Sequence, residues 1–362
     1  MSLLLNYTPY TLKFNFDAGT SRGVLKEKLV WFIKVHNETD PRNFGLGEIS
    51  TIDRLSFDFN ADFEHELGKL ADNIRGIDIP ESAQDVYVLV QQLVPSHLPS
   101  IRFALETALL DYMNGGKRQI FKNNFYWSHE NILINGLVWM GDKSFMKDQI
   151  DRKFQDGFSC IKLKIGAIDF DEELALLEYI RGKYTKEQLA LRVDANGAFT
   201  TQECMLKLKA LEAFDLHSIE QPIMPRQPEA MSLLCLKSKV PIALDEDLIG
   251  VYEEHQKKRL LDEIDPAYIV IKPSLVGGFA SAIEWINLAE ERGIGWWITS
   301  ALESNIGLNA ISQFTAEQDA MGHQGLGTGQ LFENNIPSPL RIQGEFLSYK
   351  QNAQWDFTRL EF

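Results

Sequence analysis

The chain has 362 residues, 44% of them hydrophobic and 24% charged, which is the composition of an ordinary globular protein. That length suits a large domain accompanied by a smaller one. The formal net charge of -15, without a long basic run, argues against nucleic acid and anionic membranes as partners, because both require clustered lysine and arginine. The negative net charge does not exclude a small-molecule carboxylate as substrate, because one cationic pocket can exist inside an acidic surface.

The N-terminal stretch MSLLLNYTPYTLKF has a three-leucine apolar run with no preceding charge, so it does not match a signal peptide. No stretch approaches the length of a membrane span. Cys160, Cys204 and Cys235 have no CxxC spacing, which predicts free thiols. We therefore expect a cytoplasmic protein; its oligomeric state stays open, with a homo-oligomer among the alternatives.

Residues 1–130 are expected to form an α+β capping domain. YTLKFNF (10–16) and KLVWFIKVHN (28–37) alternate like antiparallel strands, DAGTSRG (17–23) is typical of a loop, and GLGEIS (45–50) is rich in turn residues. Further on, SAQDVYVLVQQLV and SIRFALETALLDYMN show helical spacing. Strands followed by helices favour the α+β class.

Residues 131–330 change to short β-branched runs that alternate with amphipathic helices. Thr200 and Thr201 before Glu203 indicate the start of one helix. The repeat predicts an α/β fold, a modified (β/α)7β TIM-like barrel, with a short eighth unit near HQGLGTG (323–329). The predicted strands are ILINGLVW, CIKLKIG, LALRVDA, LHSIEQP, VPIALDE, AYIVIKP and IGWWITS.

An open doubly wound sheet is the structural alternative to the barrel. It would need a glycine-rich phosphate turn after its first strand, and GLVWMGDK is not such a turn. Residues 331–362 lack the barrel rhythm and are expected to return to the capping domain.

Five barrel strands end in one charged residue followed by a turn, about 25–30 residues apart, which is one βα unit. The carboxyl ends of barrel strands surround one pocket, so these side chains should form a ring. Period 2 places Lys162 beside Lys164 and Arg192 beside Asp194 on the same faces. The five residues are Lys164, Asp194, Glu220, Asp245 and Lys272.

Three carboxylates in one pocket repel one another and require protons or a cation. An all-oxygen ligand set favours a hard ion, so Mg²⁺ fits best and Mn²⁺ second. The lysines on either side would reach a bound substrate, and burial and nearby positive charge can lower the pKa of each. The alternative for any single pair is a structural ion pair, Lys164 with Asp194 or Lys272 with Asp245; five groups at even spacing favour an active site.

These residues resemble the enolase superfamily, specifically its muconate-lactonizing subgroup. The resemblance implies that Asp194, Glu220 and Asp245 bind the metal, with Lys164 and Lys272 on either side of the substrate's α-carbon. It also implies that Lys162 adds a cation near the substrate's carboxylate. The matching motifs are K-L-K (162–164), R-V-D-A-N-G (192–197), I-E-Q-P (219–222), L-D-E-D (244–247), I-K-P-S (271–274), GLGE (45–48) and RFALETALLD (102–111).

Within the subgroup, ITSALESNIGLNAISQF (298–314) and GLGTGQLF (325–332) most resemble the o-succinylbenzoate synthase family of menaquinone biosynthesis. The implied activity is that of a lyase that converts 2-succinyl-6-hydroxy-2,4-cyclohexadiene-1-carboxylate to o-succinylbenzoate by syn dehydration through an enediolate. Lys164 would remove the α-proton and return it to the departing hydroxyl, while Lys272 would stay protonated.

Several further residues are candidates for substrate binding. Arg192 and Asn196 could orient the substrate, with a buried pair with Glu220 as the alternative for Arg192. Ser300 could offer its amide to a carboxylate. Ser21 and Arg22 lie in a loop that closes over the site in this family, and an arginine there would suit an anionic substrate.

Two positions depart from the family pattern: Asp247 stands where relatives often have serine, and Gly327 where some have aspartate. We interpret both as changes around the site that leave the chemistry intact. The alternative activities on this scaffold are a muconate-type cycloisomerase and an amino-acid or dipeptide racemase-epimerase. Dipeptide epimerases usually carry Asp-x-Asp where this chain has Gly-Leu-Gly-Thr-Gly. Schiff-base aldolase chemistry and a non-catalytic binding barrel are more distant alternatives.

Overall fold

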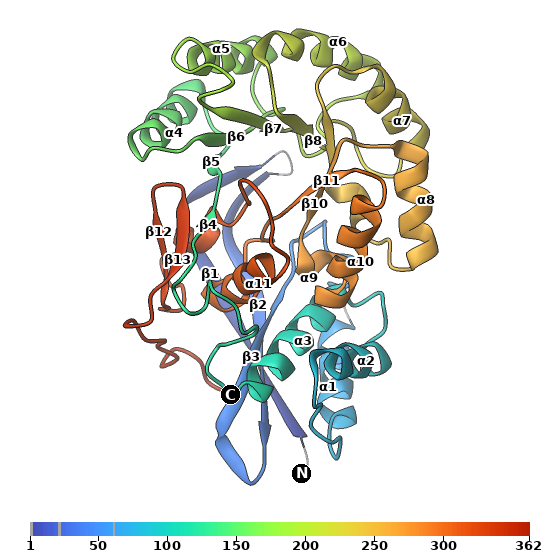
Figure 1. Ribbon diagram of the computed structural model, residues 1–362, viewed down its shortest axis with the longest axis vertical. Coiled ribbons are helices and arrows are strands. Elements are labelled where there is room, and N and C mark those ends of the chain that lie inside the picture. The colour runs from blue at the N-terminus through green and yellow to red at the C-terminus, as the bar shows by residue number, and fades with distance from the viewer. Residues whose placement is uncertain (1–2, 21–22, 61) are drawn as a thin grey trace.

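The computed structural model describes residues 3–20, 23–60 and 62–362 of the chain. A long N-terminal sheet with three helices stands beside a ring of parallel strands covered by helices (Figure 1). The expected α/β barrel with an α+β cap is confirmed. Within the described residues, no helix is both long and apolar enough to cross a membrane.

The capping domain is a three-stranded antiparallel sheet, in the order β1-β2-β3, with three helices. Its elements are β1 Leu3–Thr20, β2 Gly23–Asn37, β3 Asp40–Ser50, α1 Phe63–Asn73, α2 Ala83–Leu93 and α3 Pro99–Met113.

The GLGEIS segment belongs to strand β3, so its interpretation as a turn-rich stretch is wrong. Its glycines serve close packing: a Cβ at Gly45 would lie 1.8 Å from the carbonyl oxygen of Ala108, and one at Gly47 would lie 2.0 Å from that of Ala104. Helix α3 therefore rests directly on the backbone of β3.

The loop predicted at residues 17–23 is also wrong for its first half. Ala18 pairs with Leu25 and Gly19 with Val24, so β1 and β2 continue as a hairpin after an irregularity that follows Lys13. A bridge from Gly19 to Met140 brings this hairpin against the barrel. The strand pairing continues into this segment because it supplies hydrogen bonds to backbone N–H and C=O groups that an unpaired loop would leave without protein partners.

The barrel sheet contains all seven predicted strands, in the order β11-β10-β9-β8-β7-β6-β5. Ala243, Val270 and Trp297, one from each of three neighbouring strands, form a small buried hydrophobic cluster. The strands are β5 Gly136–Val138, β6 Cys160–Lys164, β7 Ala190–Asp194, β8 Ser218–Glu220, β9 Ile242–Leu244, β10 Tyr268–Ile271 and β11 Gly295–Ile298.

Helices on the outside of the barrel follow the strands in turn (Figure 1). The predicted start at Thr200 is confirmed, because its hydroxyl and the Glu203 carboxylate cap each other's backbone amides. The helices are α4 Lys143–Gln155, α5 Phe170–Arg181, α6 Thr201–Leu211, α7 Pro228–Lys237, α8 Glu254–Ile264, α9 Pro273–Val276, α10 Gly278–Glu290 and α11 Asn305–Glu317, with 3-10 turns η1 Glu212–Phe214, η2 Glu246–Leu248 and η3 Gly327–Gln330.

The segment around residue 324 closes the barrel in the position of an eighth strand. Gln324 bridges in parallel to Ile134, and Gly325 bridges in parallel to Thr299 at the other edge. Two residues thus replace a full strand, because backbone bonds from Leu133 and Ile298 on the two sides satisfy them.

The C-terminal segment contacts both parts of the molecule. Strands β12 Leu340–Gln343 and β13 Phe346–Tyr349 form a hairpin that pairs with β4 Ile132–Leu133. Phe332 packs on Phe14 of β1, with ring centres 4.7 Å apart. The bounds proposed for the three domains stay a prediction.

Candidate active site

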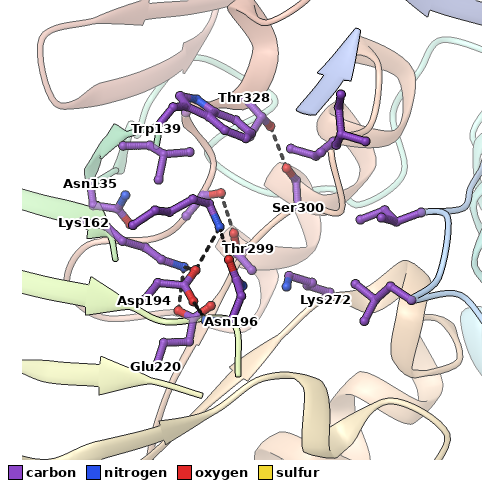
Figure 2. Close-up of a pocket in the computed structure, with 18 of the residues that line it drawn as sticks. Asn135, Trp139, Lys162, Asp194, Asn196, Glu220, Lys272, Thr299, Ser300 and Thr328 are labelled. Carbon is purple, nitrogen blue, oxygen red and sulfur yellow. Dashed lines mark hydrogen bonds and ion pairs between the residues drawn. The ribbon is translucent and has the colours of Figure 1, made fainter. Parts of the chain in front are cut away.

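Four of the five charged strand ends line a cavity of about 240 Å³ at the carboxyl end of the barrel, and the fifth, Asp245, contacts the cavity residue Lys272 (Figure 2). Residues 23–25 and 52–55 of the capping domain line its other side. Of the predicted site residues, those that line the cavity are Lys162, Lys164, Asp194, Asn196, Glu220, Lys272 and Ser300.

Lys162 bridges two of the carboxylates. Its Nζ lies 3.0 Å from Asp194 Oδ2 and 2.6 Å from Glu220 Oε2. The side chains of both acids are at most 2% exposed. Adjacent parallel strands place them together, because Lys162 pairs in register with Arg192 on β7, two residues before Asp194. The ammonium group therefore compensates two buried negative charges at once.

The two lysines predicted to face the substrate each hold one carboxylate. Lys164 Nζ lies 3.1 Å from Asp194 Oδ2 and donates to Asn196 Oδ1 at 2.7 Å. Lys272, directly after β10, forms a short ion pair with Asp245. The ion pairs considered as the alternative for these residues are thus present, and Lys164, Asp194 and Lys272 line the same cavity.

The pKa values follow from this crowding of charge. Burial raises the pKa of Glu220 to about 8, together with the negative charge of Asp194 and against the attraction of Lys162. Burial opposes the ionised form of Asp194 too, but Lys162, Lys164 and Lys272 outweigh it and hold the pKa of Asp194 well below its usual range.

The expectation of a lowered lysine pKa is wrong for Lys272 in this arrangement. Burial by itself would lower its pKa, but the negative charges of Asp245, Glu246 and Glu220 exceed that effect and raise it. Lys272 is therefore held as a cation. The same balance raises the pKa of Lys162, since Asp194 and Glu220 outweigh its burial.

The chemistry of the carboxylate set fits a hard divalent cation. Among the described residues, Glu220 Oε1 is buried without a hydrogen-bond partner, so one oxygen of the set is available as a ligand. Across the described residues, no three His, Cys, Asp or Glu side chains already stand in the geometry of a metal site. The carboxylates are instead paired with lysines: Lys162 contacts Glu220 and Lys272 contacts Asp245, at oxygens that a metal would take.

A network behind the carboxylates fixes the two turns that carry them. Gln221, which follows Glu220, accepts from the backbone amide of Asp245 at 3.1 Å and donates to Asp247 Oδ2 at 2.8 Å. Asp247 also accepts from the amide of Arg226 at 2.7 Å. Asp247 thus supports the neighbouring turn without lining the cavity, which agrees with its interpretation as a change around the site.

The predicted substrate-binding residues occupy different places. Asn196 lies in the wall between Lys164 and Glu246, and donates to Glu246 at 3.1 Å. The hydroxyl of Ser300 also lies in the wall, 2.6 Å from that of Thr328.

Arg192 does not line the cavity. Its guanidinium donates to the carbonyl of His323 at 2.9 Å and stacks on Trp297 at 4.1 Å, so direct contact with a substrate is not expected. Its alternative partner, Glu220, is paired with Lys162. Ser21 and Arg22 lie outside the described residues.

The wall residues that were not predicted include Asn135, Trp139, Leu302 and Thr328. Asn135 is 4% exposed, and its Oδ1 has no hydrogen-bond partner within the part of the chain that the structure describes, so it can accept a hydrogen bond from a ligand. The ring centre of Trp139 lies 5.9 Å from the Nζ of Lys164. Figure 2 shows Trp139 among the residues that line the cavity. Trp139 ends the predicted strand ILINGLVW, so its place in the cavity wall could have been predicted from the same rule as the charged strand ends.

Comparison with known proteins decides the family. The family model described as Enolase C-terminal domain-like matches residues 146–352. The o-succinylbenzoate synthase of Desulfotalea psychrophila is 46% identical to the chain, over 95% of the chain and 98% of its own length. The chain belongs to the enolase superfamily. Within the superfamily it is an enzyme of the o-succinylbenzoate synthase family, as the sequence motifs indicated.

Solved structures of the superfamily agree with this assignment. The crystal structure of MenC from Desulfotalea psychrophila has a TM-score of 0.86 and 42% identity, and the match covers 96% of this chain and 100% of that one. A substrate-liganded L-Ala-D/L-Glu epimerase from Bacillus subtilis has a TM-score of 0.82 at 17% identity, covering 96% of each chain, which shows the shared fold. The superfamily generally uses a divalent metal, Mg²⁺.

Proposed function

We propose that this chain catalyses the Mg²⁺-dependent syn dehydration of 2-succinyl-6-hydroxy-2,4-cyclohexadiene-1-carboxylate to o-succinylbenzoate, a step of menaquinone biosynthesis. The observation that carries the proposal is the meeting of Lys164 and Lys272, from different strands, in one cavity beside buried carboxylates. The 46% identity to an o-succinylbenzoate synthase supports the choice of substrate.

The two lysines have different tasks in this reaction. Lys164, as the free amine, takes the proton next to the ring carboxylate and returns it to the hydroxyl that leaves from the same face. The electron pair of the C–H bond becomes a ring double bond as the C–O bond breaks, so water departs and the ring becomes aromatic. Lys272 stays protonated, and its charge stabilises the anion.

The metal would be held by Asp194, Glu220 and Asp245, with Mn²⁺ as a second choice after Mg²⁺. When bound there, the ion would stabilise negative charge that grows on the substrate's carboxylate. The donor set supports this assignment, since all three ligands are carboxylates and Glu220 Oε1 is buried with no hydrogen-bond partner in the described residues. Lys162 would then contribute its charge to the substrate rather than to the acids.

The decisive assay follows formation of the aromatic product from the cyclohexadiene substrate by purified protein. Turnover should require Mg²⁺, stop in excess EDTA and return when Mg²⁺ is restored. Turnover that persists in excess chelator would contradict the metal assignment. A substrate adduct trapped by borohydride would favour aldolase chemistry instead.

Proton exchange in D₂O separates the lyase from a racemase or cycloisomerase. With one base, Lys164→Ala should abolish both exchange and dehydration, with a loss of about 10²- to 10⁴-fold or more. Lys272→Ala should abolish dehydration although Lys272 transfers no proton. The control is Lys147→Ala, because Lys147 pairs with Asp151 on the outside of the barrel. Loss of exchange from a second face in Lys272→Ala would indicate two-base chemistry.

We also propose a cytoplasmic location, which the three free cysteines support because reduced thiols suit that compartment. Assembly into a homo-oligomer stays a prediction.

A further inference from the structure

Lys28, on strand β2 of the capping domain, buries its ammonium group against the barrel. The residue is 7% exposed. Its Nζ donates to the hydroxyl of Ser50 and to the backbone carbonyls of Ala301, at 2.5 Å, and Leu302, at 2.8 Å. A buried ammonium requires such acceptors, because an unpaired one would be costly. Two of its contacts therefore go to one short barrel segment, residues 299–302, which follows β11.

The 299–302 segment faces the active site in a conformation that needs support. Thr299, Ser300 and Leu302 line the cavity. Leu302 has a φ of +61°, in the left-handed region that residues other than glycine adopt only at a cost. Because Lys28 holds the carbonyl of Leu302 itself, it opposes the return of this residue to an extended backbone.

Two buried carboxylates complete the same interface. Glu48 on β3 accepts from the amide of Ser304, the N-cap of α11, at 2.8 Å. Glu303 accepts from Ser274 Oγ at 2.5 Å. Burial lowers the pKa of Lys28 to about 8, against the attraction of Glu303 and Glu48. A cation from the cap is thus attracted to two acids, one bonded to the start of α11 and the other to the short helix α9 that follows Lys272.

We propose that Lys28 is a positioning residue: from the capping domain it holds residues 299–302 in the conformation that meets the substrate. The kinetic consequence rests on the proposed function. Because Lys28 does not line the cavity, its loss should weaken substrate binding rather than proton transfer. Affinity falls with the fraction of molecules whose segment is correctly placed, and loss of charged hydrogen bonds should raise KM by about 10-fold or more with little change in kcat.

The test compares Lys28→Met with Lys257→Met. Lys257 is a matched control, because it is 0% exposed and donates to Ser281 and Glu284, none of which line the cavity. Both substitutions should lower the thermal midpoint. Only Lys28→Met should raise KM and speed amide hydrogen exchange across residues 299–304. Lys28→Gln, which keeps an N–H donor, should give intermediate values of both readouts.

A double-mutant cycle with Leu302→Gly isolates the mechanism. Glycine adopts a positive φ without strain, so a segment with glycine at position 302 should depend less on the hydrogen bond from Lys28 to this carbonyl. The KM increase caused by Lys28→Met should therefore be smaller in the Leu302→Gly background than in the wild type. Equal increases in the two backgrounds would show that Lys28 does not act through Leu302 and would overturn the proposal.

The remaining outcomes are also decisive. Unchanged exchange across residues 299–304 in Lys28→Met, or a fall in kcat with KM unchanged, would overturn the positioning role. If the wild type fails to convert the cyclohexadiene substrate, the proposed function is wrong, and the exchange comparison still decides the role of Lys28 because it requires no substrate. If Lys28→Met does not fold, Lys28→Gln supplies both readouts.

Discussion

Replacement of Lys162 by methionine removes the cation that bridges Asp194 and Glu220. In the wild type, Lys162 Nζ lies 3.0 Å from Asp194 and 2.6 Å from Glu220. Without this ammonium group, both buried acids lose a compensating positive charge. Loss of one partner from a buried ion pair costs about 3–5 kcal/mol, because the remaining charge is left uncompensated. We therefore expect Lys162→Met to unfold more easily whenever Mg²⁺ is withheld.

The expected shift in melting temperature follows from the size of the chain. At about 2.1 cal/mol/K of unfolding entropy per residue, 362 residues give roughly 0.8 kcal/mol/K, so a loss of about 4 kcal/mol lowers the midpoint by about 5 °C. Mg²⁺ should recover more stability in Lys162→Met than in the wild type, because no ammonium competes for the same oxygens. A ligand at 100 times its Kd adds about 2.7 kcal/mol.

Thermal unfolding in EDTA and in excess Mg²⁺ measures both effects. Lys257→Met is the control, because it also breaks a buried lysine contact, with Glu284 at 2.7 Å, and neither residue lines the cavity. Its midpoint should fall while its response to Mg²⁺ equals that of the wild type. Equal Mg²⁺ responses in Lys162→Met and the wild type would refute the reasoning that Lys162 and the metal share ligands.

Two further predictions concern the capping domain. Gly47→Ala should destabilise the protein by about 3 kcal/mol or more in urea unfolding, because the new Cβ would lie 2.0 Å from a backbone oxygen of α3; Gly68→Ala in α1, with its nearest neighbour at 4.0 Å, should instead be neutral or stabilising by up to about 1 kcal/mol, and equal losses would contradict the packing argument. Burial and the charge of Glu303 raise the pKa of Glu48 to about 7 from 4.5, against the opposing effects of Lys28 and Ser304. The ionised carboxylate of Glu48 therefore destabilises the folded state fully above pH 7, and protonation relieves this destabilisation as the pH falls. As the pH rises from about 4.5 to about 7, the free energy of unfolding of the wild type relative to Glu48→Gln should therefore decrease by up to about 3 kcal/mol. An increase over that range would contradict the prediction.

The barrel could be predicted from the sequence because its signals are local and repeated. Seven β-branched runs at regular spacing specify seven strands whatever the rest of the chain does. The capping strands gave poorer predictions. In GLGEIS the same glycines are compatible with a turn or with a strand under a closely packed helix, and only the contact with Ala104 and Ala108 decides between them.

The site divides in the same way. Lys164, Asp194 and Lys272 could be placed in one pocket because the ends of parallel strands meet, whatever the loops do. The wall residues 23–25 and 52–55 could not be predicted, since they reach the cavity only through the docking of the cap on the barrel. Lys28 was missed for the same reason: its partners Ala301 and Leu302 lie more than 270 positions along the chain.

The charges in the ring explain why both metal and substrate suit this cavity. If all six groups are counted as ionised, the three lysines and three acids of the ring balance, and these side chains carry no formal net charge. Mg²⁺ by itself would leave two positive charges in a buried site, and a substrate with two carboxylates by itself would leave two negative ones. Together they restore the balance, so each should favour the entry of the other. The six residues are Lys162, Lys164, Lys272, Asp194, Glu220 and Asp245.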